Sequence, residues 1–92
     1  MSPENAETIA IRALGWLAGN EDLLGTFMGA SGTSADDFLT RAKEPEFLVS
    51  VLDFLTMDDA WVIEFCDHAG LAYDRPMRAR QALPGGQEVS WT

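Results

Sequence analysis

Apolar residues recur at every third or fourth position over residues 3–18, which is the spacing of one face of an α-helix. Ser2 is a favourable N-cap for this helix, and Pro3 suits its first position, where a missing N–H costs nothing. We expect Gly19 to end the helix in the left-handed conformation that glycine adopts readily. The apolar face of this amphipathic helix consists of Ala6, Ile9, Ala10, Ala13, Leu14 and Leu17.

Two shorter helices are predicted next. Asn20 is expected to cap a helix over residues 21–28, which Gly29 ends, and a flexible turn follows. Ser34 is expected to cap another helix, which ends before Pro45 because the residue before a proline avoids helical backbone angles. The first half of the chain therefore contains three helical segments.

The most apolar helix is predicted over residues 45–55, where apolar side chains cover most of its circumference. Such a helix belongs at the centre of a bundle, so we expect the other helices to pack around it. Thr56 is expected to cap the following helix and Gly70 to end it. Asp74 is expected to cap a last short helix over residues 75–83.

These elements predict an all-α fold, a single-domain irregular bundle of four to five short helices. The helical domain is expected over residues 1–84, and residues 85–92 are expected to form a flexible, disordered tail. Alternation typical of a strand is confined to residues 87–91, which is too short and isolated to form a sheet.

A chain of 92 residues is long enough for one domain and too short for two. Its single cysteine, Cys66, excludes an intramolecular disulfide and favours a reducing compartment. The N-terminal residues lack a signal-peptide pattern, and the apolar runs fall far short of the roughly 20 residues of a spanning helix. We therefore expect a cytoplasmic protein.

Acidic residues dominate the chain, which has a formal net charge of −9. Residues 1–70 contain thirteen acidic and three basic side chains, whereas residues 71–92 contain two and three. An acidic body repels the phosphates of nucleic acids and of anionic membranes. Partners of these two classes are therefore not expected.

Six segments allow the chain to be compared with known families: ALGWL at 13–17, LGTF at 24–27, PEFLVSVLDFL at 45–55, DD at 58–59, FC at 65–66 and RQALPG at 80–85. Together they resemble an uncharacterised family of short bacterial all-helical proteins, which is classed as a domain of unknown function. The resemblance spans roughly residues 6–86. It implies a helical bacterial protein and transfers no activity, cofactor or site residue.

The motifs of common enzyme classes are incomplete in this chain. The glycine-rich stretch over residues 25–34 lacks the lysine and the preceding strand of a P-loop, and residues 29–32 miss the G-x-S-x-G pattern. A catalytic pair of Cys66 and His68 is not expected, because residues two apart lie on different faces of a helix. We predict no catalytic residues and no cofactor, and Cys66 is interpreted as a small core residue.

Glu64 and His68 are the best candidates for a metal or acid–base site, to which Asp53, Asp58 or Asp59 could contribute in principle. Glu64 and His68 lie four residues apart and therefore share one face of a helix. A metal site needs at least one further ligand, which the spacing does not identify. The simpler interpretation is a solvated helix pair, so no metal is predicted.

Two features suggest a binding surface. Arg75, Arg78 and Arg80 form a basic segment that Trp91 follows. This segment either docks on the chain's own acidic residues, which is the simpler interpretation, or binds an acidic partner or a second copy. Trp16 lies at the edge of the first apolar face, where it either closes the core or acts as an interface anchor.

The function predicted from these observations is a small cytoplasmic protein-interaction or adaptor domain, which binds a protein partner or associates with itself. The alternative is a helical protein that binds a small molecule or a metal near Glu64 and His68. An enzyme is not expected.

Overall fold

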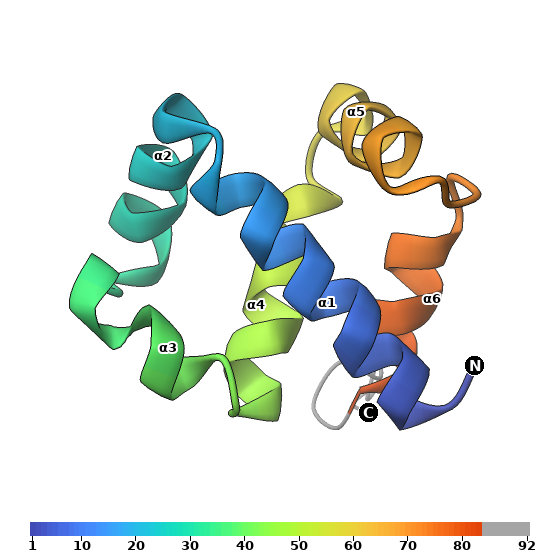
Figure 1. The fold of residues 1–92 in the computed structure, drawn as a ribbon, viewed down its shortest axis with the longest axis horizontal. Coiled ribbons are helices and arrows are strands. Elements are labelled where there is room, and N and C mark those ends of the chain that lie inside the picture. The colour runs from blue at the N-terminus through green and yellow to red at the C-terminus, as the bar shows by residue number, and fades with distance from the viewer. Residues whose placement is uncertain (84–92) are drawn as a thin grey trace, which may run out of the picture.

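The computed structural model describes residues 1–83, apart from the side chains of Ala35, Phe38 and Leu39. This part of the chain is helical and contains no strand, so the predicted all-α fold is confirmed (Figure 1). The helices are α1 (Pro3–Ala18), α2 (Glu21–Ser31), the single-turn helices η1 (Ala35–Asp37) and α3 (Phe38–Arg41), α4 (Pro45–Leu55), α5 (Asp59–Ala69) and α6 (Arg75–Ala82). The predicted tail, including Trp91, lies outside the described residues.

Helix α1 begins as predicted, because the Asn5 backbone N–H donates to Oγ of Ser2 at 3.2 Å. It also ends at Ala18 as predicted, but the left-handed conformation predicted for Gly19 is wrong. Gly19 has φ −84°, a right-handed conformation, and its N–H is shared between the carbonyls of Gly15 and Trp16. The last turn of α1 therefore tightens instead of reversing, and the chain passes directly into the N-cap of α2.

Helix α2 is capped by Asn20 as predicted, since its Oδ1 accepts from the Leu23 N–H at 3.4 Å. The predicted end at Met28 is wrong, because Gly29 stays helical and the helix continues to Ser31. Gly32 takes the left-handed conformation with φ 73°, so it is the second glycine that reverses the chain.

Helix α4 has the predicted bounds and buries six side chains. The predicted capping of α5 by Thr56 is wrong. Asp58 caps α5 by accepting from the Ala60 N–H at 2.8 Å, while the Thr56 hydroxyl donates to the Asp53 carbonyl at the end of α4. The predicted end of α5 at Gly70 is confirmed, with φ 72°.

Helix α1 crosses in front of α4 and α6, and α5 lies at the top of the view (Figure 1). The core lies where α1, α4 and α6 meet, and α1 also contacts α2 and α5. The expectation that α4 alone is central therefore needs correction. One side of α4 faces solvent at Asp53, and α1 contacts more of the other helices than α4 does. Both α1 and α4 are therefore central.

In the described part of the chain, no helix combines the length and the apolar character needed to cross a bilayer.

Candidate interaction groove

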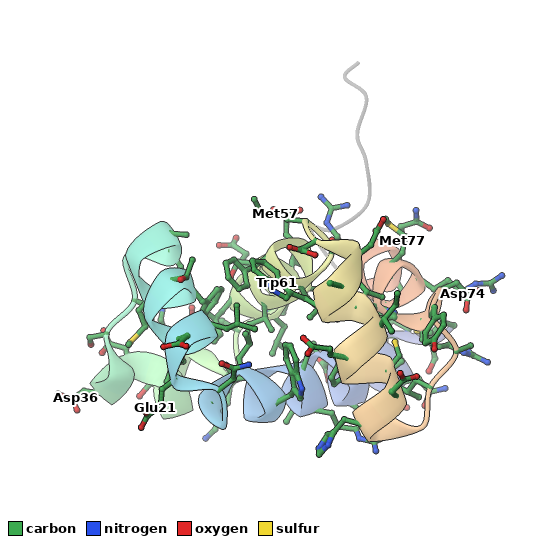
Figure 2. The ribbon with its side chains drawn as sticks, turned by 90° about the horizontal axis from the view of Figure 1, so that it is seen from above. Glu21, Asp36, Met57, Trp61, Asp74 and Met77 are labelled. Atoms are coloured by element: carbon green, nitrogen blue, oxygen red, sulfur yellow. The ribbon has the colours of Figure 1, made fainter. Side chains whose placement is uncertain are left out.

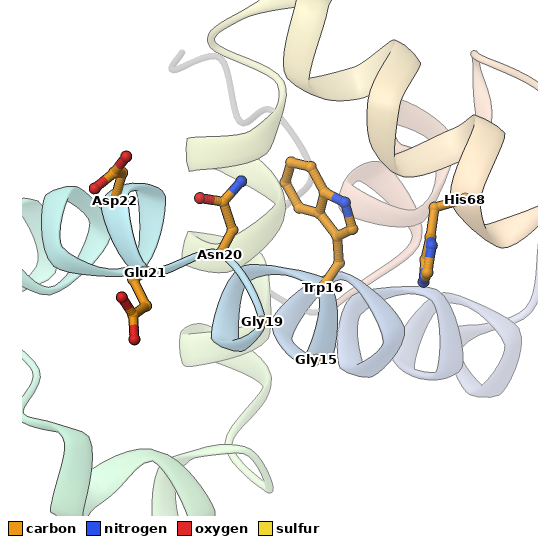
Figure 3. A pocket seen from close by; sticks show the side chains of 7 residues that line it. All are labelled: Gly15, Trp16, Gly19, Asn20, Glu21, Asp22 and His68. Carbon is orange, nitrogen blue, oxygen red and sulfur yellow. The ribbon is translucent and has the colours of Figure 1, made fainter.

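A surface groove lies where the end of α1, the start of α2 and the end of α5 meet, and its volume is about 710 Å³ (Figure 3). We call it the Trp16 groove, after the half-buried tryptophan at its middle. Its lining residues are Gly15, Trp16, Gly19, Asn20, Glu21, Asp22 and His68. It brings together two residues that the sequence suggested for different reasons, Trp16 and His68.

Two contacts hold α5 against α1 and so place His68 at the groove. The Trp16 and Phe65 rings pack edge to face with centroids 6.0 Å apart. Nη2 of Arg12 donates to the carbonyl of Ala69 at 3.2 Å, which satisfies one of the terminal carbonyls of α5. His68 directly precedes this anchored residue, so the position of the imidazole depends on both contacts.

Gly15 of α1 and Gly19, which directly follows this helix, line the groove and leave the backbone uncovered there. Gly15 lies inside the helix, where glycine is roughly 0.5–1 kcal/mol less stable than alanine. A Cβ at Gly15 would have no atom within 4 Å, so nothing in the described fold requires glycine at this position. Gly15 therefore lowers the stability of α1, and no packing contact of the fold explains its presence.

The charges of the groove are negative and lie at one end. Glu21 and Asp22 lie in the first turn of α2, where the helix dipole favours acidic side chains. Figure 3 shows the Trp16 indole between these carboxylates and His68 at the other end. Within residues 1–83, neither carboxylate has an ion pair, and the lining has no lysine or arginine.

The Glu64–His68 pair is only partly a feature of this groove. Both side chains are exposed, but His68 lines the groove and Glu64 does not. Among the described residues, no three His, Cys, Asp or Glu side chains lie close enough together to hold a metal ion. A metal site at this pair would need a ligand from elsewhere.

The three arginines of α6 differ in their contacts. Nε of Arg80 pairs with Oδ1 of Asp53 in α4 at 3.1 Å. This is a contact of the basic segment with the chain's own acidic residues, as the sequence suggested. Arg78 pairs locally with Asp74 at 2.8 Å, and Arg75 is exposed. Among the ion pairs of residues 1–83, that of Arg80 is therefore the one that connects the basic segment to the acidic body.

Cys66 is buried, and its thiol donates to the Ala72 carbonyl at 3.4 Å. Burial raises the pKa of the thiol, and the negative charges of Asp67 and Asp74 raise it further. A thiol that stays protonated is a poor nucleophile. Cys66 therefore has the surroundings of a core residue, as the sequence suggested.

A second exposed surface surrounds Met57, whose accessible fraction of 75% is large for an apolar residue. Phe54, which lines the same hollow as Met57, stacks on Trp61 with ring centroids 4.9 Å apart. Figure 2 shows Met57 and Met77 at one edge of the molecule and Glu21 at the opposite edge. The Met57 surface and the Trp16 groove are thus separate features.

Sequence reasoning missed the glycines, Asn20 and the two carboxylates as groove residues. The available signal was Gly15, a glycine inside a strongly periodic helix. Glu21 and Asp22 gave no such signal, because acidic residues are ordinary in the first turn of any helix.

The fold and the groove define an all-α protein with an open acidic groove on its surface. Residues 3–86 match the family model described as "Protein of unknown function (DUF3572)", and the chain belongs to this family. The family resemblance of the sequence is thus confirmed. No curated protein and no solved structure matches the chain.

Proposed function

We propose that this chain is a small protein-interaction domain that binds its partner through the Trp16 groove. The observation that carries the proposal is a half-buried tryptophan beside a bare stretch of helix backbone. Tryptophan is enriched among the residues that dominate binding energy. Glycine permits the backbone of a ligand to approach closely. Packing within the described fold accounts for the part of the Trp16 ring that contacts Phe65. It does not account for a glycine at position 15.

We propose a different protein as the partner in preference to a second copy. Two copies that each have a net charge of −9 repel one another, and Arg80 is already paired within the chain. Sedimentation velocity at low and high salt should therefore show a monomer in both conditions. A stable dimer at both salt concentrations would favour self-association instead.

We further propose that the chain acts in the cytoplasm and has no catalytic activity. The lone thiol supports the first statement, since a reducing compartment suits an unpaired cysteine. Two residues support the second: the buried Cys66 and the exposed His68 lie on different sides of α5, so they do not form a nucleophile–base pair there.

Site-specific photo-crosslinking tests the interaction proposal. A benzoylphenylalanine at Ala18, which is exposed and three positions after Gly15, preserves every lining residue of the groove. The matched control places the same group at Tyr73, an exposed aromatic residue outside the groove. In cells that naturally make the chain, the Ala18 variant should yield a discrete adduct of higher mass. Adducts of equal yield at both positions, or at neither, would refute the proposal.

The second candidate function is small-molecule binding in the same groove. It is favoured by one observation, that Trp16 and His68 face a single hollow whose volume is in the range of ligand pockets, roughly 300–1,000 Å³. A thermal-shift screen against metals and metabolites separates the two functions. A compound that raises the melting temperature of the wild type, but not of the Trp16→Leu variant, would favour this second function.

A further inference from the structure

We infer that the partner presents a basic segment and inserts a lysine or arginine side chain into the Trp16 groove. This inference rests on the proposed function and specifies the chemistry of the partner. It is carried by the combination of groove shape, charge and aromatic surface.

The carboxylates of the groove face solvent and have no ion-pair partner within residues 1–83. Glu21 and Asp22 are both exposed, and the groove lining holds no lysine or arginine that would pair with them. Arg12, on the same helix as Trp16, donates to the carbonyl of Ala69 instead. A cationic side chain of a partner would therefore enter a negative field without displacing an internal arginine or lysine.

The aromatic wall suits the same kind of ligand. Trp16 packs against Phe65 edge to face, but a part of its ring system stays accessible in the groove. The face of tryptophan attracts ammonium and guanidinium groups more strongly than that of any other side chain. Figure 3 shows Asn20 between the indole and the two carboxylates, so a basic segment that covers the groove could place one cation on the ring and another near Glu21 or Asp22.

An anionic ligand fits the same groove poorly, although a helix N-terminus lies there. The start of α2 would ordinarily attract a phosphate or carboxylate. Its first turn already contains Glu21 and Asp22, and Oδ1 of Asn20 accepts from the Leu23 N–H. The groove thus selects against acidic partners and for basic ones.

Fluorescence anisotropy with labelled peptides tests this inference. The probe is a fluorescein-labelled nonapeptide in which lysine and arginine alternate with glycine, and two matched peptides carry glutamate or glutamine at the basic positions. Titrations at about 50 mM and about 200 mM salt separate local binding from the general attraction of an acidic protein. The basic peptide should bind, and the other two should bind at least about tenfold more weakly.

The groove variant Glu21→Gln with Asp22→Asn has a matched control, Glu4→Gln with Glu46→Gln. Both pairs remove two negative charges from first helical turns, and Glu4 and Glu46 do not line the groove. The groove pair should weaken binding of the basic peptide by about tenfold, and the control pair by less than about twofold. Trp16→Leu should weaken it by about threefold to fivefold without changing the charge.

Equal losses in the groove pair and the control pair would overturn the inference, because binding would then reflect only the overall charge. Binding of the glutamine peptide as tight as that of the basic peptide would also overturn it. If no peptide binds but crosslinking from position 18 still yields an adduct, the basic-segment inference fails and the proposed function stands. If the adduct is missing as well, both fail. Circular dichroism of each variant confirms that it is folded.

Discussion

The two sides of α1 use small residues in different ways. On the side that packs in the core, Ala6, Ala10 and Ala13 are fully buried. On the groove side, Gly15 and Gly19 are exposed. The alanines allow neighbouring helices to approach closely, whereas a Cβ at Gly15 would have no neighbour within 4 Å. Packing thus accounts for the small residues on one side of the helix and not for Gly15 on the other.

This difference indicates which substitutions should affect stability and which should affect binding. A residue whose neighbours are all part of the fold is maintained for stability, so changing it should change the free energy of unfolding. A residue that costs stability and contacts nothing is better explained by a ligand. Substitutions on the packed side of α1 should therefore change stability, and substitutions on the groove side should change binding.

Leu17→Ala changes the packed side of α1 and should have the largest effect on stability. Leu17 is fully buried, and removal of a buried leucine side chain lowers the free energy of unfolding by about 2–5 kcal/mol. Urea denaturation measures the change. The control is Ile11→Ala on the same helix, where half of the side chain is exposed, and it should lower stability by less than about 1 kcal/mol. Similar losses in both variants would mean that the packed side has been assigned wrongly.

Much of the packed side could be predicted from the sequence. The caps at Ser2 and Asn20, the bounds of α4 and the left-handed Gly70 follow from local signals, because the backbone groups concerned lie within a few residues. The errors at Gly19 and Gly29 have different causes. Either Gly29 or Gly32 satisfies the local rule for ending α2, and the direction of the next segment decides that Gly32 reverses the chain. Gly19 does not reverse the chain, because α1 passes directly into the N-cap of α2.

The groove could be predicted only in part. Trp16 and His68 were each named from local features, but the groove exists because α5 packs against the end of α1. That packing depends on the bond between Arg12 and the Ala69 carbonyl, which no periodicity or spacing reveals. Helical spacing suggested that His68 acts together with Glu64, four residues before it. It did not predict that His68 and Trp16 line the same groove.

Helix α5 repeats the contrast of α1, with Cys66 on its packed side and His68 on its groove side. Because burial raises the pKa of the Cys66 thiol, the unfolded chain loses this proton at a lower pH than the folded chain. The thiol's contribution to stability is complete below the unfolded pKa of about 8.5 and is lost as pH rises through the folded pKa. The free energy of unfolding should fall by at most about 1.4 kcal/mol per pH unit in this range.

Urea denaturation between about pH 7.5 and 9.5 measures this slope, and Cys66→Ala is the control that removes the titrating group. The range lies below the ordinary tyrosine pKa of about 10, so the unfolded Tyr73 is mostly protonated there; the pKa of the folded Tyr73 is raised by its hydrogen bond to Asp67. A slope that persists unchanged in Cys66→Ala would assign it to another group.

Gly15→Ala should separate stability from binding most clearly. The added Cβ meets no atom of the fold and improves helix propensity, so the free energy of unfolding should rise by about 0.5–1 kcal/mol. The same methyl group occupies the groove, so the crosslinked adduct from position 18 should decrease. The matched control is Gly25→Ala in α2, which is also exposed with open space around its Cβ. It should give a similar gain in stability with an unchanged adduct.

Arg80→Met should have the smallest effect, because it tests a partly exposed ion pair on the packed side of the molecule. Arg80 joins α6 to Asp53 of α4, and such pairs contribute about 0.2–1 kcal/mol. Arg78→Met is the control, since its pair with Asp74 lies within one turn of α6 and connects no two helices. A double-mutant cycle with Asp53→Asn should give a coupling energy for Arg80 and none for Arg78. Absence of coupling at Arg80 would mean that α6 is held to α4 by apolar packing alone, and that the basic segment stays available to a partner.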